Sequence, residues 1–155
     1  MKMKRLNPYY VTGLVEGEGS FYVGILPRKL GKVDFEVRPS FSLSQHKKNR
    51  SLLFKLKDYF GCGTIRFSKK DQTYKFEVRS LKDLKEKILP HFEKFPLQGK
   101  KKKDFEILKG VVEMMEKKEH LEKDGLLKII ELVERMAGNE KRKKFLQKIA
   151  TSLKE

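Results

Sequence analysis

The stretch "LNPYYVTGLVEGEGSF", residues 6–21, begins as an apolar helix and ends with two carboxylates among three glycines. Asn7 followed by Pro8 predicts a helix start, because an Asn side chain accepts from an unpaired backbone N–H and proline in the first turn has no N–H to leave unbonded. Gly13 and Gly17 leave bare backbone on one helix face, although each glycine costs a helix about 1 kcal/mol relative to alanine. The sequence therefore raises the question of what contacts that bare face.

The composition predicts one basic domain with a polyanionic partner. The chain has 155 residues, long enough to bury a core, and its 37 Lys and Arg against 21 Asp and Glu give a formal net charge of +16. A solvated, lysine-rich surface of a thermophilic protein is the alternative explanation of this charge. The single cysteine, Cys62, excludes an internal disulfide and a cysteine-based zinc site. No apolar run approaches the roughly 18 residues of a membrane span, so we expect an intracellular protein without a membrane partner.

Hydrophobic periodicity predicts two β-hairpins, each followed by a helix. Apolar and polar residues alternate in four segments, which predicts strands at 20–26, 33–45, 63–68 and 72–79. We expect an edge or a bulge at Pro39, which would remove a ladder hydrogen bond, and an inward-facing Phe67. Helical spacing predicts a helix over 47–61 that ends at Gly61, and a second helix that starts at Ser80 and is broken by Pro90.

Three further helices are predicted beyond the lysine run, at about 102–117, 124–137 and 140–153. The element order predicts an α+β fold with an αββαββα core, in which helices cover one face of a four-stranded antiparallel sheet. We expect a single domain over residues 1–155, with the core at 1–99 and the C-terminal helices at 100–155.

The uncovered face of the predicted sheet carries hydrogen-bonding side chains of moderate length. A solvated sheet face is one interpretation, but with the net charge we favour a saddle that reads a nucleic acid in the major groove. The side chains assigned to it are Ser20, Tyr22, Gly24, Glu36, Arg38, Ser40, Ser42, Thr64, Arg66, Ser68, Thr73, Lys75 and Glu77, with Arg28 and Lys102 as further DNA contacts.

Residues 11–19, "VTGLVEGEG", resemble the nine-residue motif of the LAGLIDADG homing endonucleases. The resemblance continues through "FSLSQHKKN" at 41–49 and "FPLQGKKKKDFEILKGVVEMMEKKEHL" at 95–121, and it covers roughly residues 6–137. The resemblance implies that the motif helix packs against its counterpart from a second copy. Because one motif occurs here, a homodimer is expected, with Tyr10, Gly13, Leu14 and Gly17 at its interface. The alternative is that the two glycines pack within their own domain.

The resemblance also implies the site residues. Glu18 occupies the position of the metal-binding acid, with Gly17 beside it, while Glu16 is either structural or a metal ligand. Gln45 matches the residue that holds the water network. Lys100 matches the lysine near the scissile phosphate, with Lys102 as the alternative. We expect Mg²⁺ as the cofactor, Mn²⁺ as a substitute, and Ca²⁺ to support binding without cleavage.

The implied function is metal-dependent cleavage of both strands of a long, pseudo-palindromic duplex DNA site, without a small-molecule substrate. An intron maturase, or a noncatalytic nucleic-acid-binding protein of the same fold, is the alternative. His46, after the second strand, is expected to be structural rather than a general base. His91 and His120 are expected to be surface residues or satisfied helix residues, because neither has a partner at metal-ligand spacing.

Overall fold

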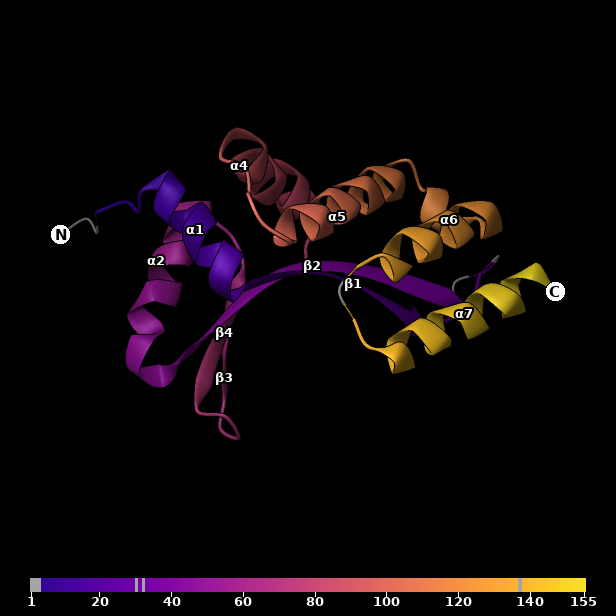
Figure 1. Ribbon diagram of the computed structural model, residues 1–155, viewed down its shortest axis with the longest axis horizontal. Coiled ribbons are helices and arrows are strands. Elements are labelled where there is room, and N and C mark those ends of the chain that lie inside the picture. The colour runs from indigo at the N-terminus through magenta and orange to yellow at the C-terminus, as the bar shows by residue number, and fades with distance from the viewer. Residues whose placement is uncertain (1–3, 30, 32, 137) are drawn as a thin grey trace. The chain divides into compact units, whose positions relative to one another are not determined.

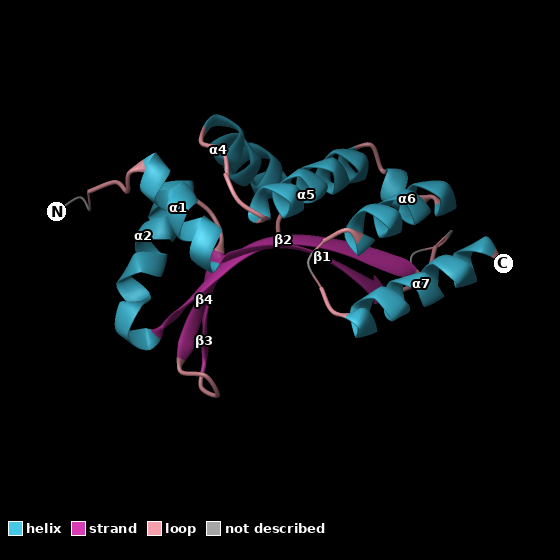
Figure 2. Ribbon diagram, viewed as in Figure 1, coloured by secondary structure: helices cyan, strands magenta, loops and turns pink. Residues whose placement is uncertain are grey.

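The computed structural model describes residues 4–29, 31, 33–136 and 138–155 of the protein. It has the predicted α+β organisation, with helices and strands in the expected order (Figures 1 and 2). The elements are α1 (Pro8–Glu18), β1 (Gly19–Pro27), β2 (Phe35–His46), a 3₁₀ turn (Lys47–Asn49), α2 (Arg50–Phe60), β3 (Thr64–Ser68), β4 (Thr73–Val78), α3 (Leu81–Asp83), a π-helical turn (Leu84–Ile88), α4 (Leu89–Lys94), α5 (Lys101–Glu116), a second 3₁₀ turn (Glu119–Leu121), α6 (Lys123–Glu134) and α7 (Glu140–Lys154).

The four strands form one sheet in the order β1-β2-β4-β3. The antiparallel ladder between β2 and β4 runs from Phe41↔Val78 to His46↔Thr73. Pro39 therefore lies beyond this ladder, at a point where β2 has no β4 hydrogen bond to lose. Of the edge or bulge expected at Pro39, the structure shows an edge on the β4 side alone, because β2 lies between β1 and β4.

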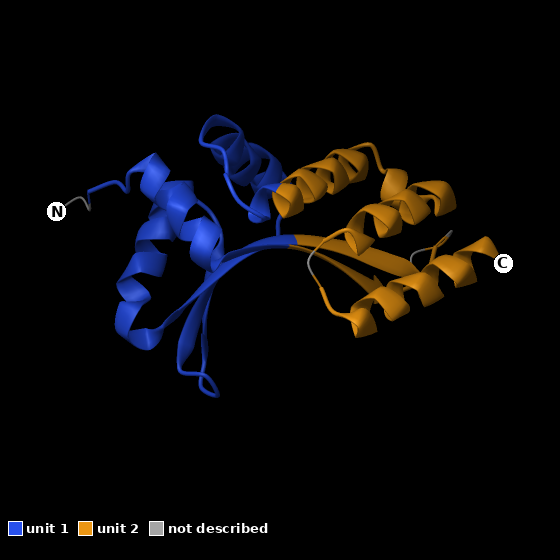
Figure 3. Ribbon diagram, in the orientation of Figure 1, with its two compact units in different colours: residues 1–21, 40–102 blue, residues 22–39, 103–155 orange. Residues whose placement is uncertain are grey.

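Contacts divide the chain into two compact units (Figure 3). The first unit comprises residues 1–21 and 40–102, and its core is a cluster of phenylalanine rings around the fully buried Phe41. The ring centroid of Phe41 lies 5.3 Å from that of Phe21, 5.7 Å from that of Phe60 and 6.2 Å from that of Phe76. The cluster joins both hairpins to α2, which explains why the alternating Phe positions mark the inward face.

The second unit comprises residues 22–39 and 103–155. The C-terminal helices α5, α6 and α7 belong to it, and α6 packs against α7. Their buried positions follow the helical spacing read from the sequence and are Phe105, Ile107, Leu108, Val111, Val112, Leu126, Ile129, Ile130, Val133, Leu146 and Ile149. The expectation of a single domain over 1–155 stays a prediction.

The prediction that Pro90 breaks its helix is wrong. Ser80 caps the helix start, where its side chain accepts from the Asp83 N–H at 3.2 Å. The chain then passes through the π-helical turn, in which the Leu89 N–H donates to the Leu84 carbonyl five residues back. α4 begins at Leu89, so Pro90 lies in the first turn of a helix, where a missing N–H removes no intrahelical hydrogen bond.

Phe67 lies on the predicted inward face of β3, the face that it shares with the buried Phe76, but it is not itself buried. Phe67 is 42% exposed and its ring lies against that of Tyr74, with 4.8 Å between centroids. Phe67 and Tyr74 are cross-strand partners, one residue pair from the turn end of the β3–β4 hairpin. Alternation gives the face of a strand on which a residue lies, but not how far along the strand the helices extend.

Candidate functional site

The motif helix α1 ends at Glu18 and leads directly into β1. Asn7 caps its start, where Oδ1 accepts from the Tyr9 N–H at 2.8 Å. At its other end the Gly19 N–H donates to the Val15 carbonyl, and a Cβ on Gly19 would lie 2.7 Å from a methyl group of Val15. Only glycine fits this junction. Glu18, just before it, is exposed, and its carboxylate has no hydrogen bond or ion pair to any described residue.

Glu16 fastens the segment that follows α4 to the end of the motif helix. Its Oε1 accepts from the backbone N–H of Gly99 at 2.7 Å and from that of Gln98. A Cβ on Gly99 would lie 3.1 Å from Glu16 Oε2, so glycine allows the close approach. Lys101 Nζ donates to the backbone carbonyl of Glu16 at 2.7 Å. Of the two roles that the sequence left open for Glu16, these contacts favour the structural one.

Lys101 is the lysine that sequence reasoning missed. The sequence candidates are Lys100 and Lys102, which are exposed and whose side chains form no hydrogen bond or ion pair with a described residue. Lys101 instead binds a carbonyl in the last turn of α1, where unpaired carbonyls and the helix dipole attract a cation. Because the Lys101 side chain is bound to the Glu16 carbonyl, Lys100 and Lys102 remain the two candidates from the sequence.

Gln45 lies at the end of β2, where its side-chain oxygen accepts from Asn49 Nδ2 at 2.8 Å. The structure therefore joins the Glu18-bearing helix end to the lysine segment through Glu16, while the described hydrogen bond of Gln45 goes to Asn49. His46 Nδ1 accepts from the Lys48 N–H at 3.2 Å and caps the 3₁₀ turn. This is the structural role expected for His46.

The glycine face of α1 is open within the part of the chain that the structure describes. A Cβ on Gly13 or Gly17 would meet nothing within 4 Å, and both residues are exposed. Tyr10 is 49% exposed and Leu14 is half-buried. The alternative that these glycines pack within their own domain therefore has no support in the described residues.

In the first unit, one face of the sheet gathers cations around a buried carboxylate. Arg66 and Lys75 are cross-strand partners, and so are Thr64 and Glu77. The Glu77 carboxylate is 3.4 Å from Arg66, 3.4 Å from Lys75 and 3.2 Å from Arg79. Ser42 pairs with Glu77 and is buried, so its hydroxyl is less accessible than a place on the uncovered face suggests. Ser68 and Thr73 form the next row that faces the same way, and both are half-buried.

In the second unit, Glu36 holds two arginines. Its carboxylate is 3.0 Å from Arg28 and 3.1 Å from Arg38, and the hydrogen bonds from Arg38 and Arg28 hold the pKa of Glu36 below its usual value. Gly24 is buried, and a Cβ there would approach the Tyr22 ring to 3.3 Å. Two remaining candidates belong to the first unit, where Ser20 is exposed and Ser40 is buried.

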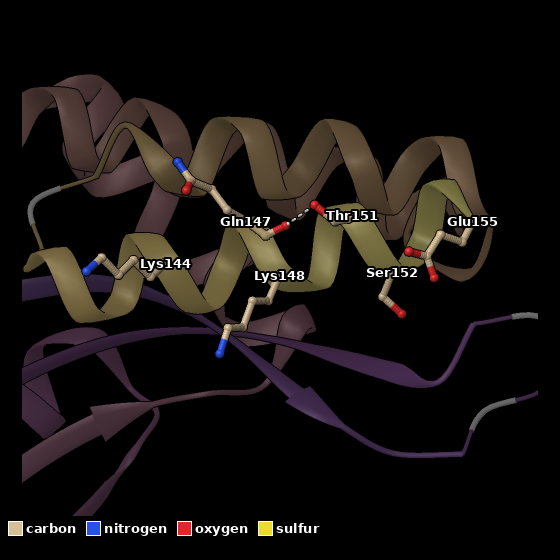
Figure 4. Close-up of a pocket in the computed structure, with 6 residues that line it drawn as sticks. All are labelled: Lys144, Gln147, Lys148, Thr151, Ser152 and Glu155. Carbon is tan, nitrogen blue, oxygen red and sulfur yellow. Dashed lines mark hydrogen bonds between the residues drawn. The ribbon is translucent and has the colours of Figure 1, made fainter.

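Helix α7 contributes a cation that the sequence did not single out. The guanidinium of Arg142 lies 4.2 Å from the centroid of the Tyr22 ring, and it donates a hydrogen bond to the Val23 carbonyl. The same helix carries a shallow hollow on its outer face, lined by Lys144, Gln147, Lys148, Thr151, Ser152 and Glu155 (Figure 4). None of the predicted catalytic or metal-binding residues lines this hollow.

His91 is a buried helix residue with both ring nitrogens satisfied. Nε2 lies 3.0 Å from Thr12 Oγ1, and Nδ1 lies 2.9 Å from the Tyr59 hydroxyl. Burial, and to a smaller extent the charge of Arg5, lowers the pKa of His91 to about 4. This confirms the satisfied role among those expected. Burial also lowers the pKa of His120.

We expect the folded protein to lose stability as the pH falls from about 6.5 to about 4. Over that pH range His91 binds a proton in the unfolded chain but not in the folded chain. Acid therefore lowers the free energy of unfolding, by at most about 3 kcal/mol. Urea unfolding of the wild type and of His91→Gln, from pH 7 to pH 4, checks this. The wild type should show the steeper loss, whereas parallel curves would exclude His91 as the source. His46→Gln, which changes an exposed histidine, is the control and should follow the wild type.

The described residues contain no group of three histidine, cysteine or acidic side chains that could hold a metal ion. They also contain no helix long and apolar enough to cross a membrane.

Comparison with protein families decides what this arrangement is. The family model for the LAGLIDADG endonuclease matches residues 11–112, from the motif helix into α5. This chain belongs to the LAGLIDADG endonuclease family.

Curated LAGLIDADG relatives are intron-encoded or homing proteins. An uncharacterised 50.9 kDa protein in ND4 intron 1 of Podospora anserina is 36% identical over 78% of this chain and 27% of its own length. Probable intron-encoded endonuclease 3 of Neurospora crassa is 33% identical over 83% of this chain and 24% of its own length. The homing endonuclease I-ApeII of Aeropyrum pernix is 31% identical over 66% of this chain and 60% of its own length. The chain thus spans about a quarter of the two fungal proteins.

Solved structures of LAGLIDADG proteins share the fold over nearly the whole chain. The homing endonuclease I-TnaI superposes with a TM-score of 0.88 at 38% identity and matches 97% of this chain and 99% of its own. I-LtrWI, a LAGLIDADG homing endonuclease bound to target DNA, superposes with a TM-score of 0.84 at 32% identity, over 90% of this chain and 47% of its own. The chain is therefore about as long as I-TnaI and about half as long as I-LtrWI.

Proposed function

We propose that this chain is a homing endonuclease that acts as a homodimer and cleaves both strands of a long, pseudo-palindromic DNA site. The observation that carries the proposal is the unpartnered Glu18 carboxylate at the end of a helix whose glycine face is open. A second copy docked on this face would bring its own Glu18 beside the first. The match to about half of the DNA-bound I-LtrWI chain supports this, because two copies would supply the remaining half.

The donor set fits a divalent cation only when it is shared between copies. One chain offers a single exposed carboxylate at Glu18, and no described cluster of three ligating side chains completes a site around it. Two Glu18 carboxylates, the Gly17 carbonyl and DNA phosphate oxygens would make the oxygen-rich environment that Mg²⁺ prefers. When bound, such a cation supplies the positive charge that activates a water and offsets charge on the leaving 3′ oxygen. Mn²⁺ should substitute, and Ca²⁺ should support binding alone.

The side chains beside Glu18 have distinct roles in this proposal. Glu16 holds Gln98 and Gly99 and so fixes where the lysine run begins. Lys100, or Lys102 as the alternative, approaches the scissile phosphate and neutralises its developing charge. Gln45 orients water through the amide N–H groups that its bond to Asn49 leaves available.

The uncovered sheet face is proposed as the reading surface. Strand β2 has 12 residues, which at about 3.3 Å each span on the order of 40 Å. Because B-DNA rises about 3.4 Å per base pair, each protomer would cover about 10 to 12 pairs and the dimer about 20 to 24. Arg38 and Arg66 are suited to bidentate contacts with guanine.

Arg38→Ala should relax base selection at one position in each half-site, symmetrically, by about 1 to 3 kcal/mol. The guanidinium reads a base edge, whereas an exposed lysine such as Lys103 meets a phosphate. Lys103→Ala is thus the matched control, which should weaken all sites alike and lower the salt slope by about one unit. Selection from a randomised duplex library measures both variants. Unchanged base preferences in Arg38→Ala would count against the sheet face as the reader.

The direct test of the function incubates the protein with a randomised duplex library in Mg²⁺ or in Ca²⁺. Ends cut in Mg²⁺ and retained duplexes in Ca²⁺, converging on one pseudo-palindrome, are expected. Retention of one site without cutting would favour a noncatalytic DNA-binding protein of this fold. No retained duplex, with retention of structured RNA instead, would favour a maturase.

A further inference from the structure

A directional chain of hydrogen bonds runs through the first unit from α2 to the residue that follows α4. Thr12 Oγ1 donates to the Phe95 carbonyl at 2.8 Å, because a carbonyl can only accept. The single hydroxyl proton of Thr12 is thereby used, so the 3.0 Å contact with His91 Nε2 requires that nitrogen to donate. His91 is therefore protonated at Nε2. Its Nδ1 then accepts from the Tyr59 hydroxyl at 2.9 Å.

Burial keeps His91 and Tyr59 in the protonation states that these hydrogen bonds require. Burial lowers the pKa of His91 to about 4, so the ring is neutral near pH 7. Burial also raises the pKa of Tyr59, which keeps its phenol proton available for donation. The rings of Phe60 and Phe92 lie 5.4 Å and 4.6 Å from that of His91, and they exclude water from it. In such a buried site a polar group without a hydrogen-bond partner costs free energy. Each donor must therefore face its acceptor, which fixes the tautomer of His91.

This series of hydrogen bonds ends at Phe95, just before the segment that Glu16 binds. Phe95 is held by Thr12, three residues later Gln98 and Gly99 are held by Glu16, and Lys101 is held to the Glu16 carbonyl. The segment 95–101 is thus fastened to α1 at the level of Thr12 and again one helical turn later, at Glu16. Both attachments fix the same thing, the position of the lysine run along the motif helix.

We propose that His91 is a positioning residue for cleavage, whose Nε2–H orients the Thr12 hydroxyl onto the Phe95 carbonyl and so sets the lysine run against the Glu18-bearing helix. This inference rests on the proposed function, and it assigns that function a control point that touches neither DNA nor metal. Phosphate neutralisation depends on close placement of the lysine, and a displacement of about 1 Å lowers a rate about 100-fold. We call the hydrogen-bonded series Tyr59–His91–Thr12–Phe95 the relay. Loss of the relay should slow cleavage, while the sheet face and the DNA affinity stay unchanged.

The test compares Thr12→Val, which keeps the shape and removes the hydroxyl, with Thr12→Ser, which keeps the hydroxyl. Single-turnover cleavage should fall about 100-fold in Thr12→Val and recover to within about threefold of wild type in Thr12→Ser. The DNA dissociation constant in Ca²⁺ should stay within about threefold for both. The backbone amides of Gln98 and Gly99 should exchange with solvent faster in Thr12→Val alone. Wild-type cleavage and exchange in Thr12→Val would overturn the proposal.

Nitrogen NMR of His91 in the wild-type protein provides a second test, which requires neither a variant nor a cleavage assay. A protonated Nε2 and an unprotonated Nδ1 at pH 7 are expected, and the reverse tautomer or a doubly protonated ring would overturn the relay. If the wild type cuts no duplex, the proposed function fails while the tautomer and the amide exchange still decide the relay. If the wild type cuts and Thr12→Val cuts equally fast, the relay fails as a control of cleavage and the proposed function stands.

Discussion

Glu18→Gln is expected to abolish double-strand cleavage while it leaves specific DNA binding within about tenfold of wild type. The substitution keeps the size of the side chain and removes the charge that a divalent cation requires. Glu18 is exposed and has no partner among the described residues, so the change leaves the fold of α1 intact. A plasmid carrying the selected site measures cleavage in Mg²⁺, and gel retardation in Ca²⁺ measures binding.

Glu16→Gln is the matched control, two residues earlier in the same helix. A glutamine oxygen can still accept from the Gln98 and Gly99 N–H groups, although without charge, so this variant should keep measurable cleavage. The two acids are thereby separated into a ligand and a clamp. Near wild-type cleavage by purified Glu18→Gln would remove Glu18 from the active site. Equal loss in both variants would return Glu16 to the candidate metal ligands.

Gly13→Leu should convert the proposed dimer to a monomer and so eliminate cleavage of both strands. A Cβ at position 13 meets nothing within 4 Å in the single chain, but a leucine side chain there would hold two motif helices apart. Leucine favours a helix over glycine by about 0.8 kcal/mol, so a loss of activity cannot come from weakened helix formation. Light scattering of the DNA complex and thermal unfolding of the free protein measure assembly and folding separately.

Lys144→Leu, which places the same apolar side chain on the exposed face of α7, is the control for non-specific effects. It should leave the mass of the DNA complex unchanged. A Gly13→Leu protein that scatters as the wild type does, or a wild-type protein that cuts DNA as a monomer, would contradict dimerisation along α1.

Features governed by neighbouring residues were predictable from the sequence. The Asn7 cap depends on contacts within three residues, and the left-handed Gly61, with φ of 69°, ends α2 as its position implies. The sheet faces follow from alternation, which places Lys75 and Phe76 on opposite sides of β4. The resemblance of the motif predicts Glu18 as a metal ligand and the glycine face as a dimer interface, and both stay predictions.

Contacts between residues far apart in the chain were not predictable in this way. Glu16 meets Gly99 across 83 positions, and Thr12 meets His91 across 79. No local pattern marks such partners, and the run of four lysines conceals which one is bound to the helix end. Pro90 was misjudged for a different reason, because proline is compatible with a helix once a π-helical turn precedes it.

The shared carboxylates of the sheet make its arginines and lysines interdependent. Glu36 forms ion pairs with both Arg28 and Arg38. Glu77 forms ion pairs with Arg66, Lys75 and Arg79. A substitution at one cation changes the electrostatic environment of the other cations that share its carboxylate, so effects within each group are non-additive. If the sheet face reads DNA as proposed, an altered target preference would therefore be acquired by exchanging all the cations around one carboxylate at once. Libraries that aim to change the target site should randomise all the cations of one group together, because the effect of a single substitution depends on the other cations that share its carboxylate.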